Sequence, residues 1–127
     1  MSELVFDTSI LIDHLRNVDK ATEIVEKVKE GSIVGYISIL TEAELFAGKD
    51  SADSNKRALL VELLNIFNKI EVNEGIARLA GEFKRKYNIS LADAIIAATS
   101  FMTRCKLITQ NIKDFKKISE IASEKPY

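Results

Sequence analysis

The sequence predicts an α/β fold in which a short parallel sheet is covered on both faces by helices. Short apolar runs rich in β-branched residues recur along the chain, and stretches with helical periodicity separate them. Strands that alternate with helices indicate parallel pairing, because the crossover returns each strand to the same direction. The 127 residues contain no repeat, low-complexity segment or linker. We therefore expect one domain over residues 1–127, with four or five strands and more helix than strand.

The composition is ordinary for a soluble globular protein, with 46% hydrophobic and 29% charged residues and a net charge of −1. This charge provides no global basic field for nucleic acid, although bound cations would change the local balance. The single cysteine, Cys105, excludes an intrachain disulfide and a cysteine-built zinc site. No apolar run approaches the roughly 18 residues of a membrane span, and no secretory signal is visible. A cytoplasmic protein without membrane contact is expected.

The first half of the chain predicts two strands, each followed by helix. Residues 4–6 form an apolar strand that ends at Asp7, and residues 33–39 form a β-branched and aromatic strand. Helical spacing of apolar residues, or a capping residue before them, predicts the helices that follow. These helices are expected around residues 10–15, 21–28 and 42–47. Asn17 or Asp19 would cap the second helix, and Gly31 would end it at positive φ. Thr41 would open the third helix.

The second half repeats this alternation. The strongest helical stripe of the chain runs from Leu59 to Phe67 and is followed by a short strand over residues 69–72. Apolar residues from 76 to 83 predict a helix that ends near Asn88, and Ser90 begins another that continues through Phe101. Residues 106–109 predict a last clear strand, and residues 111–115 a short helical turn. The tail with the only proline, Pro126, has no assigned structure.

Four acidic residues are expected to meet at one edge of the sheet. Asp7 follows the first strand, Glu44 lies in the helix after the second strand, and Asp114 follows the last clear strand. The elements that follow parallel strands emerge at the same edge, where ligands of open α/β sheets bind. Asp93 lies in the first turn of the helix that Ser90 begins and can face the same edge. The sequence therefore predicts an acidic site.

Such a cluster is stable only when something neutralises it, because carboxylates at close range raise one another's pKa. A divalent cation does so in many proteins, and oxygen-only ligands favour Mg²⁺ or Mn²⁺. A bound cation of this kind activates water and orients a phosphodiester for hydrolysis. Each acid also has a simpler explanation as a helix cap. Thr41 with Glu44 and Ser90 with Asp93 fit the capping-box spacing, and Asp7 could cap the helix after it.

Four segments resemble successive motifs of PIN-domain proteins, specifically VapC-type toxins of prokaryotic toxin–antitoxin pairs. In chain order they are LVFDTSILID, ISILTEAELFAG, LADAIIAATS and LITQNIKDF, and the resemblance extends over about residues 3–118. It implies a PIN-like three-layer α/β/α sandwich with a short parallel sheet. It also implies a Mg²⁺- or Mn²⁺-dependent endoribonuclease with an RNA substrate, inhibition by a cognate antitoxin, and a homodimer.

The resemblance also assigns roles to residues. Asp7, Glu44 and Asp93 correspond to the first three acids of the family, with Asp7 and Asp93 holding the main cation and Glu44 positioning or deprotonating the attacking water. Thr8 or Ser9 would orient Asp7. Many members have an aspartate where this chain has Asn111, so Asn111 and the nearby Asp114 are expected to complete the outer shell, and a second metal site is in doubt.

Two other protein classes remain as alternatives. The first is a non-catalytic α/β binding module whose acidic residues are helix caps or interface groups. The second is a receiver-like phosphotransfer domain, which also has an aspartate after a strand. A receiver would need two adjacent acids after the first strand and a lysine after the last, and the sequence has Asp7-Thr8 and Thr109-Gln110 at these positions.

Overall fold

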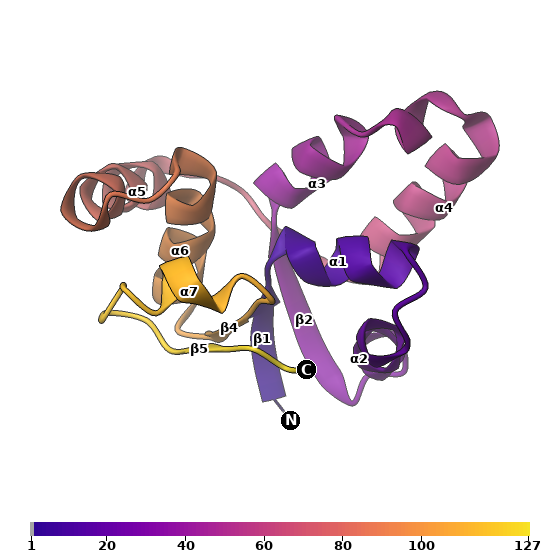
Figure 1. Cartoon of the computed structure of the whole chain (residues 1–127), viewed down its shortest axis with the longest axis horizontal. Coiled ribbons are helices and arrows are strands. Elements are labelled where there is room, and N and C mark those ends of the chain that lie inside the picture. The colour runs from indigo at the N-terminus through magenta and orange to yellow at the C-terminus, as the bar shows by residue number, and fades with distance from the viewer. Residues whose placement is uncertain (1) are drawn as a thin grey trace.

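The fold is a five-stranded, fully parallel sheet with helices on both faces, and the computed structural model describes residues 2–127 (Figure 1). The strand order is β3-β2-β1-β4-β5. The strands are β1 (Ser2–Phe6), β2 (Ile33–Ser38), β3 (Asn68–Ile70), β4 (Lys106–Ile108) and β5 (Ser123–Glu124). The central strand β1 pairs with β2 on one side and with β4 on the other. The α/β sandwich with a short parallel sheet is confirmed.

Seven α-helices and one short 3-10 helix connect the described strands. They are α1 (Thr8–Leu15), α2 (Asp19–Lys29), α3 (Ile39–Phe46), the 3-10 helix η1 (Lys49–Ala52), α4 (Ser54–Leu64), α5 (Glu74–Tyr87), α6 (Leu91–Thr103) and α7 (Ile112–Phe115). Helices α5 and α6 pack side by side on one side of the sheet, and α1, α2 and α4 lie on the other side (Figure 1). None of the helices within residues 2–127 is long and apolar enough to cross a membrane.

The sheet separates two hydrophobic cores, because successive strand residues face opposite sides. Val5 and Leu107 belong to the core under α5 and α6, whereas their neighbours Phe6 and Ile108 belong to the core under α1, α2 and α4. All four side chains are buried. Burial on both faces is the usual condition of a parallel sheet and explains why these strands are continuously apolar.

Three of the expected helix starts and strand ends are wrong in detail. Ser38, not Thr41, caps α3, because its hydroxyl accepts a hydrogen bond from the Leu40 amide and the helix already begins at Ile39. The cap of α2 is Val18, since Asn17 has a positive φ of 63° and ends the preceding helix. The third strand, β3, begins one residue earlier than the expected range 69–72 and ends at Ile70, so it is shorter. Gly31 has the expected positive φ, 89°.

The C-terminal segment contributes a strand that the sequence does not reveal. Ser123 and Glu124 pair in parallel with β4 and form the edge of the sheet. Beyond them the tail returns to α1, where the Tyr127 hydroxyl donates a 2.8 Å hydrogen bond to Oδ2 of Asp13. The Asp13 carboxylate is thus bonded within the chain. Burial, then this hydrogen bond, raises the pKa of Tyr127 well above its ordinary range.

Candidate active site

Asp7 lies at the carboxyl end of the central strand and is almost fully buried, with 4% of its surface exposed. It precedes α1, but its side chain makes no capping hydrogen bond. Oδ2 instead accepts two hydroxyl hydrogens, from Ser9 at 2.9 Å and from Thr109 at 2.7 Å. Charge-assisted bonds of this kind hold a carboxylate firmly. The helix-cap explanation of Asp7 is therefore wrong, and the residue that orients it after β1 is Ser9 rather than Thr8.

The same two hydroxyls connect Asp7 to the loop after β4. Ser9 Oγ accepts a hydrogen bond from the Gln110 amide at 3.1 Å, and Thr109 Oγ1 accepts one from the Asn111 amide at 2.9 Å. Each hydroxyl thus uses its hydrogen on the carboxylate and a lone pair on the loop backbone. The loop that carries Asn111 is therefore placed by Asp7 and its two hydroxyl partners.

Glu44 lies in α3, which follows β2, and its side chain meets the start of α1. Oε1 of Glu44 accepts a 2.7 Å hydrogen bond from Thr8, and Oγ1 of Thr8 also lies 2.9 Å from Oγ1 of Thr41. Glu44 is not the second half of a capping box, since Thr41 lies inside the helix. Glu42 points elsewhere and pairs with Lys69 at 2.6 Å. Glu44 is thus the acid of α3 that faces the strand ends.

Asp93 lies in the first turn of α6, whose cap is Ser90 as expected. The Ser90 hydroxyl accepts a hydrogen bond from the Asp93 amide at 3.1 Å. Burial raises the pKa of the Asp93 carboxyl, and the negative charge of Asp7 raises it further, followed by the charges of Asp114 and Glu44. The Ser90 hydroxyl opposes this shift. The other three acids that the sequence singles out are therefore close enough for their charges to act on Asp93.

The fourth corner of the site contains an amide and an ion-paired acid. Asn111 is exposed at the N-terminal end of α7, and its side chain does not cap that helix. Asp114, in the same helix, pairs with Lys117 at 3.2 Å, with both side chains about half exposed. Asp114 is the residue there that contributes negative charge to the neighbourhood of Asp93.

The donor set suits a hard divalent cation but does not form a closed cage. No group of three acidic, histidine or cysteine side chains in residues 2–127 is already arranged around a common metal position. Mg²⁺ does not require one, because it keeps several waters and binds through one or two carboxylates. A cation beside Asp7 and Asp93 would remove the repulsion that raises the pKa of Asp93. The residues present therefore fit such an ion.

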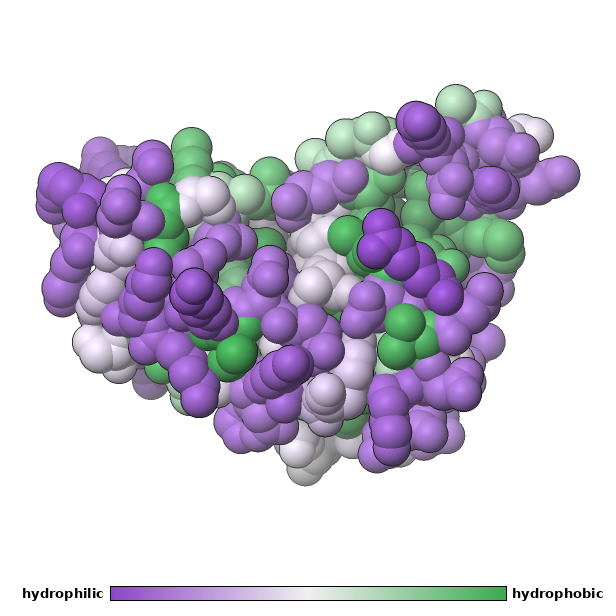
Figure 2. Space-filling model, viewed as in Figure 1, coloured by the Kyte–Doolittle hydropathy of each residue, from purple (hydrophilic) through white to green (hydrophobic). Residues whose placement is uncertain are grey.

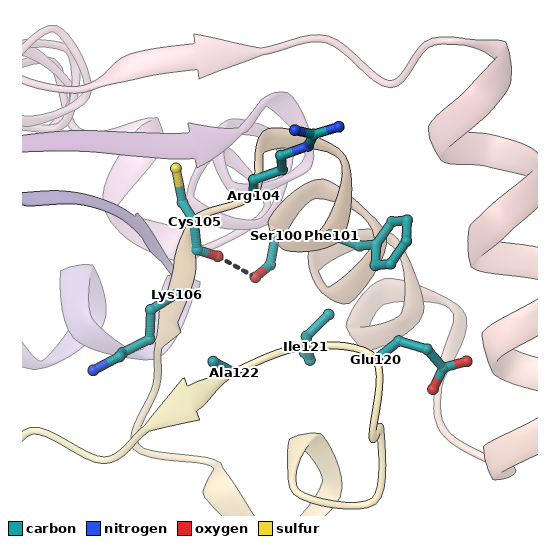
Figure 3. A pocket seen from close by; sticks show the side chains of 8 residues that line it. All are labelled: Ser100, Phe101, Arg104, Cys105, Lys106, Glu120, Ile121 and Ala122. Atoms are coloured by element: carbon teal, nitrogen blue, oxygen red, sulfur yellow. Dashed lines mark hydrogen bonds between the residues drawn. The ribbon is translucent and has the colours of Figure 1, made fainter.

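The surface above the strand ends is open. Figure 2 shows the molecule hollowed between the side that carries α3 and α4 and the side that carries α5 and α6. Glu44 borders a hollow of about 270 Å³ that Arg16 and Lys49 also line. A larger hollow, about 380 Å³, lies at the opposite, amino-terminal end of β4 and is lined by residues such as Phe101, Arg104 and Glu120 (Figure 3). This larger hollow is therefore at the opposite end of the sheet from the four acids.

The fold and the acidic edge together define a PIN-type nuclease architecture, and comparison with known proteins agrees. The model of the PIN domain family matches residues 4–121, so the chain belongs to the PIN domain family. It is 30% identical to Ribonuclease VapC19 of Mycobacterium tuberculosis, over 97% of this chain and 98% of that protein. It is 27% identical to Ribonuclease VapC2 of Methanocaldococcus jannaschii, over 92% of this chain and 89% of that protein.

Solved structures are similar over nearly the whole chain. A chain of a toxin–antitoxin complex from Klebsiella pneumoniae superposes with a TM-score of 0.82 at 31% identity, covering 98% of both chains. A chain of the FitAcB structure from Neisseria gonorrhoeae superposes with a TM-score of 0.76 at 22% identity, covering 97% of both chains, and supports the fold.

Sequence reasoning missed the roles of two threonines. Thr41 and Thr109 are both fully buried, and their hydroxyls lie among the acids. Thr109 directly follows β4, and Thr41 lies in the first turn of the helix that follows β2. The position after a strand is the signal in the sequence that could have identified them.

Proposed function

We propose that this protein is a Mg²⁺- or Mn²⁺-dependent endoribonuclease, with residues 1–127 acting as one nuclease domain. One observation carries the proposal. Asp7 follows β1, Glu44 lies in the helix after β2 and Asp114 in the helix after β4, at the carboxyl edge of the parallel sheet, and the charges of all three act on Asp93 in the first turn of α6. Unrelated helix caps would have no reason to meet there. The names of the relatives, both called ribonucleases, support RNA as the substrate.

Within this site Asp7 and Asp93 would hold the cation. Ser9 and Thr109 both bond Oδ2 of Asp7, which leaves Oδ1 as the oxygen available for a ligand. When bound, the cation supplies charge neutralisation for the phosphodiester and lowers the pKa of a coordinated water. Asn111 and Asp114 would complete the outer shell.

Glu44 would position the attacking water and accept its proton. Thr8 occupies Oε1 of Glu44, so Oε2 is the oxygen left for this role. Glu44 is exposed to solvent, as a group that exchanges protons with water must be. Arg16 and Lys49, which line the same hollow, would contact phosphates of the RNA beside it.

The biological role that fits these residues is that of the toxin of a toxin–antitoxin pair. Likeness to a chain of the Klebsiella pneumoniae toxin–antitoxin complex at 31% identity supports a cognate antitoxin protein as the partner. A homodimer and a cytoplasmic location, where the RNA substrate is found, belong to the same proposal.

A non-catalytic module built on helix caps is the weaker alternative. Asp7 does not cap α1, and Ser38 takes the place of the proposed cap at Thr41. Ser90 does cap α6 by accepting the Asp93 amide, so this half of the expected capping box is present, but the cap does not explain why the charges of Asp7, Asp114 and Glu44 act on Asp93.

The direct test is cleavage of a mixed RNA pool by the purified protein with Mg²⁺, with Mn²⁺ and with EDTA. We expect fragments only with the cations, and none from Asp7→Asn. Asp19→Asn is a matched control, because Asp19 is an exposed acid in α2 outside the site. Equal cleavage by wild type and Asp7→Asn would refute the proposal.

A further inference from the structure

Two hydroxyls and one carboxylate form a hydrogen-bonded chain that links the start of α1 to α3. Oγ1 of Thr41 lies 2.9 Å from Oγ1 of Thr8, and Oγ1 of Thr8 lies 2.7 Å from Oε1 of Glu44. Thr41 has no exposed surface, Thr8 has 6%, and Glu44 is exposed. The chain therefore runs from a fully buried hydroxyl to a solvent-exposed carboxylate.

Counting hydrogens fixes the direction of both bonds. The Glu44 carboxylate has no hydrogen to donate, so the single hydroxyl hydrogen of Thr8 must go to Oε1. Thr8 then has only lone pairs left for Thr41. The hydroxyl of Thr41 must donate to Thr8, although the distance alone permits either direction.

Thr41 differs from Thr99, an equally buried threonine inside a helix. Thr99 in α6 donates its hydroxyl to the backbone carbonyl of Ile95, one turn earlier, at 2.8 Å. This internal bond is the usual one for helical threonines. Thr41 lies too close to the start of α3 for it, because the residue four positions earlier, Ile37, is still in β2. Among residues 2–127 the Thr41 hydroxyl has Thr8 as its one hydrogen-bond partner.

From this arrangement we infer that Thr41 is a positioning residue, which holds the Thr8 hydroxyl in the orientation that fixes Glu44 for its part in RNA cleavage. The inference rests on the proposed function. Thr41 has no exposed surface and its hydroxyl bonds only Thr8 within residues 2–127, so it would act through Thr8 rather than on substrate or cation. Without the hydrogen bond that Thr41 donates, the Thr8 side chain can rotate about χ1. Oε1 of Glu44 then loses the one partner that holds this exposed side chain against α1.

The first test compares Thr41→Val, which keeps the shape of the side chain, with Thr41→Ser, which keeps the hydroxyl. We expect Thr41→Val to lower kcat for RNA cleavage roughly threefold to tenfold with KM nearly unchanged, as one neutral hydrogen bond would. Thr41→Ser should stay within about twofold of wild type. Thr99→Val removes an equally buried hydroxyl outside the site and should leave kcat unchanged.

A double-mutant cycle tests whether Thr41 acts through Thr8. In a protein that already carries Thr8→Val, adding Thr41→Val should cause no further loss of kcat, because the Thr8 hydroxyl that connects Thr41 to Glu44 is already absent. We call this Thr41–Thr8–Glu44 chain the relay. Independent, multiplicative losses would overturn the inference. Equal kcat values for Thr41→Ser and Thr41→Val would also overturn it, because they would make the effect one of packing.

A readout without RNA or metal separates this inference from the proposed function. Three-bond NMR couplings to the Thr8 methyl carbon report its χ1 angle in the purified protein. We expect one rotamer in wild type, Thr41→Ser and Thr99→Val, and rotamer averaging in Thr41→Val. Unchanged couplings in Thr41→Val refute the relay, whereas averaged couplings in a protein that cleaves no RNA refute only the nuclease proposal.

Discussion

Thr109 donates its hydroxyl hydrogen to Oδ2 of Asp7 at 2.7 Å, although 102 positions separate the two residues in the sequence. Both are buried, and the Thr109 hydroxyl also accepts the Asn111 amide. This bond therefore joins the Asp7 carboxylate to the loop that carries Asn111.

Replacing Thr109 by valine should affect both stability and cleavage. The change removes a donor to a buried carboxylate and leaves the Asn111 amide without its acceptor, so we expect a loss of about 1 to 3 kcal/mol in the free energy of unfolding. Thr109→Ser should recover most of this loss. Urea unfolding of the three proteins measures it, and equal stability of wild type and Thr109→Val would contradict the structural role.

Replacing either proposed cation ligand should abolish cleavage without unfolding the protein. Loss of an outer partner of a metal site typically costs roughly 10- to 100-fold in activity, and Asp7→Asn or Asp93→Asn should cost more. RNA cleavage measures the activity, and far-UV circular dichroism checks the fold. A fully active Asp93→Asn protein would exclude the proposed arrangement.

Added cations should raise the thermal stability of wild type. A ligand that binds only the folded state stabilises it by about 2.7 kcal/mol at a hundred times its dissociation constant. Thermal unfolding with Mn²⁺ and with EDTA should therefore differ for wild type and much less for Asp7→Asn. The exposed Asp19→Asn should behave like wild type. An identical Mn²⁺ response in Asp7→Asn would place the cation elsewhere.

The raised pKa of Asp93 predicts a pH dependence of stability in EDTA. Burial and the neighbouring carboxylates raise this pKa, so the folded protein holds the proton more tightly than the unfolded chain does. Stability from this group is therefore lost as pH rises from the ordinary aspartate pKa through the raised value. Asp93→Asn should gain stability over wild type across this window, and urea unfolding at several pH values measures it. A constant difference would contradict the shift.

Arg16 should contribute to RNA binding through phosphate. It lines the hollow beside Glu44 and is exposed, so Arg16→Ala should weaken binding of all RNA sequences alike. The slope of log K against log salt should fall by about 1, as for the loss of one phosphate contact. Arg78→Ala is the control, because Arg78 pairs with Glu74 on the exposed face of α5. An unchanged salt slope in Arg16→Ala would remove Arg16 from the RNA path.

The sheet could be predicted from the sequence, and so could the position of three of the acids after strands, because both depend on local patterns. Buried parallel strands are continuously apolar, and residues that follow such strands share an edge. The short strand β5 could not be seen, because Ser123 and Glu124 have no apolar pattern and are ordered by pairing with β4. Leu59 shows the limit of periodicity, because it belongs to the helical stripe of α4 and is 59% exposed.

The hydroxyl contacts of the site were beyond sequence reasoning for a different reason. Thr8 reaches Glu44 across 36 positions and Thr41 across 33, so these bonds depend on the tertiary placement of α1 against α3. The residue types alone left Thr8 and Ser9 equivalent. The structure separates them, because consecutive residues at the start of α1 point to different acids.

The place of β1 at the centre of the sheet has a consequence for the time at which the acidic edge can form. β1 is translated first, but its neighbour β4 and the hydroxyl of Thr109 lie about a hundred residues later. At roughly 5 to 20 residues per second, synthesis separates Asp7 from Thr109 by about 5 to 20 seconds. In a nascent chain the Asp7 carboxylate therefore lacks its Thr109 partner, and the acidic edge stays incomplete, until β4 and the residue after it have been synthesised.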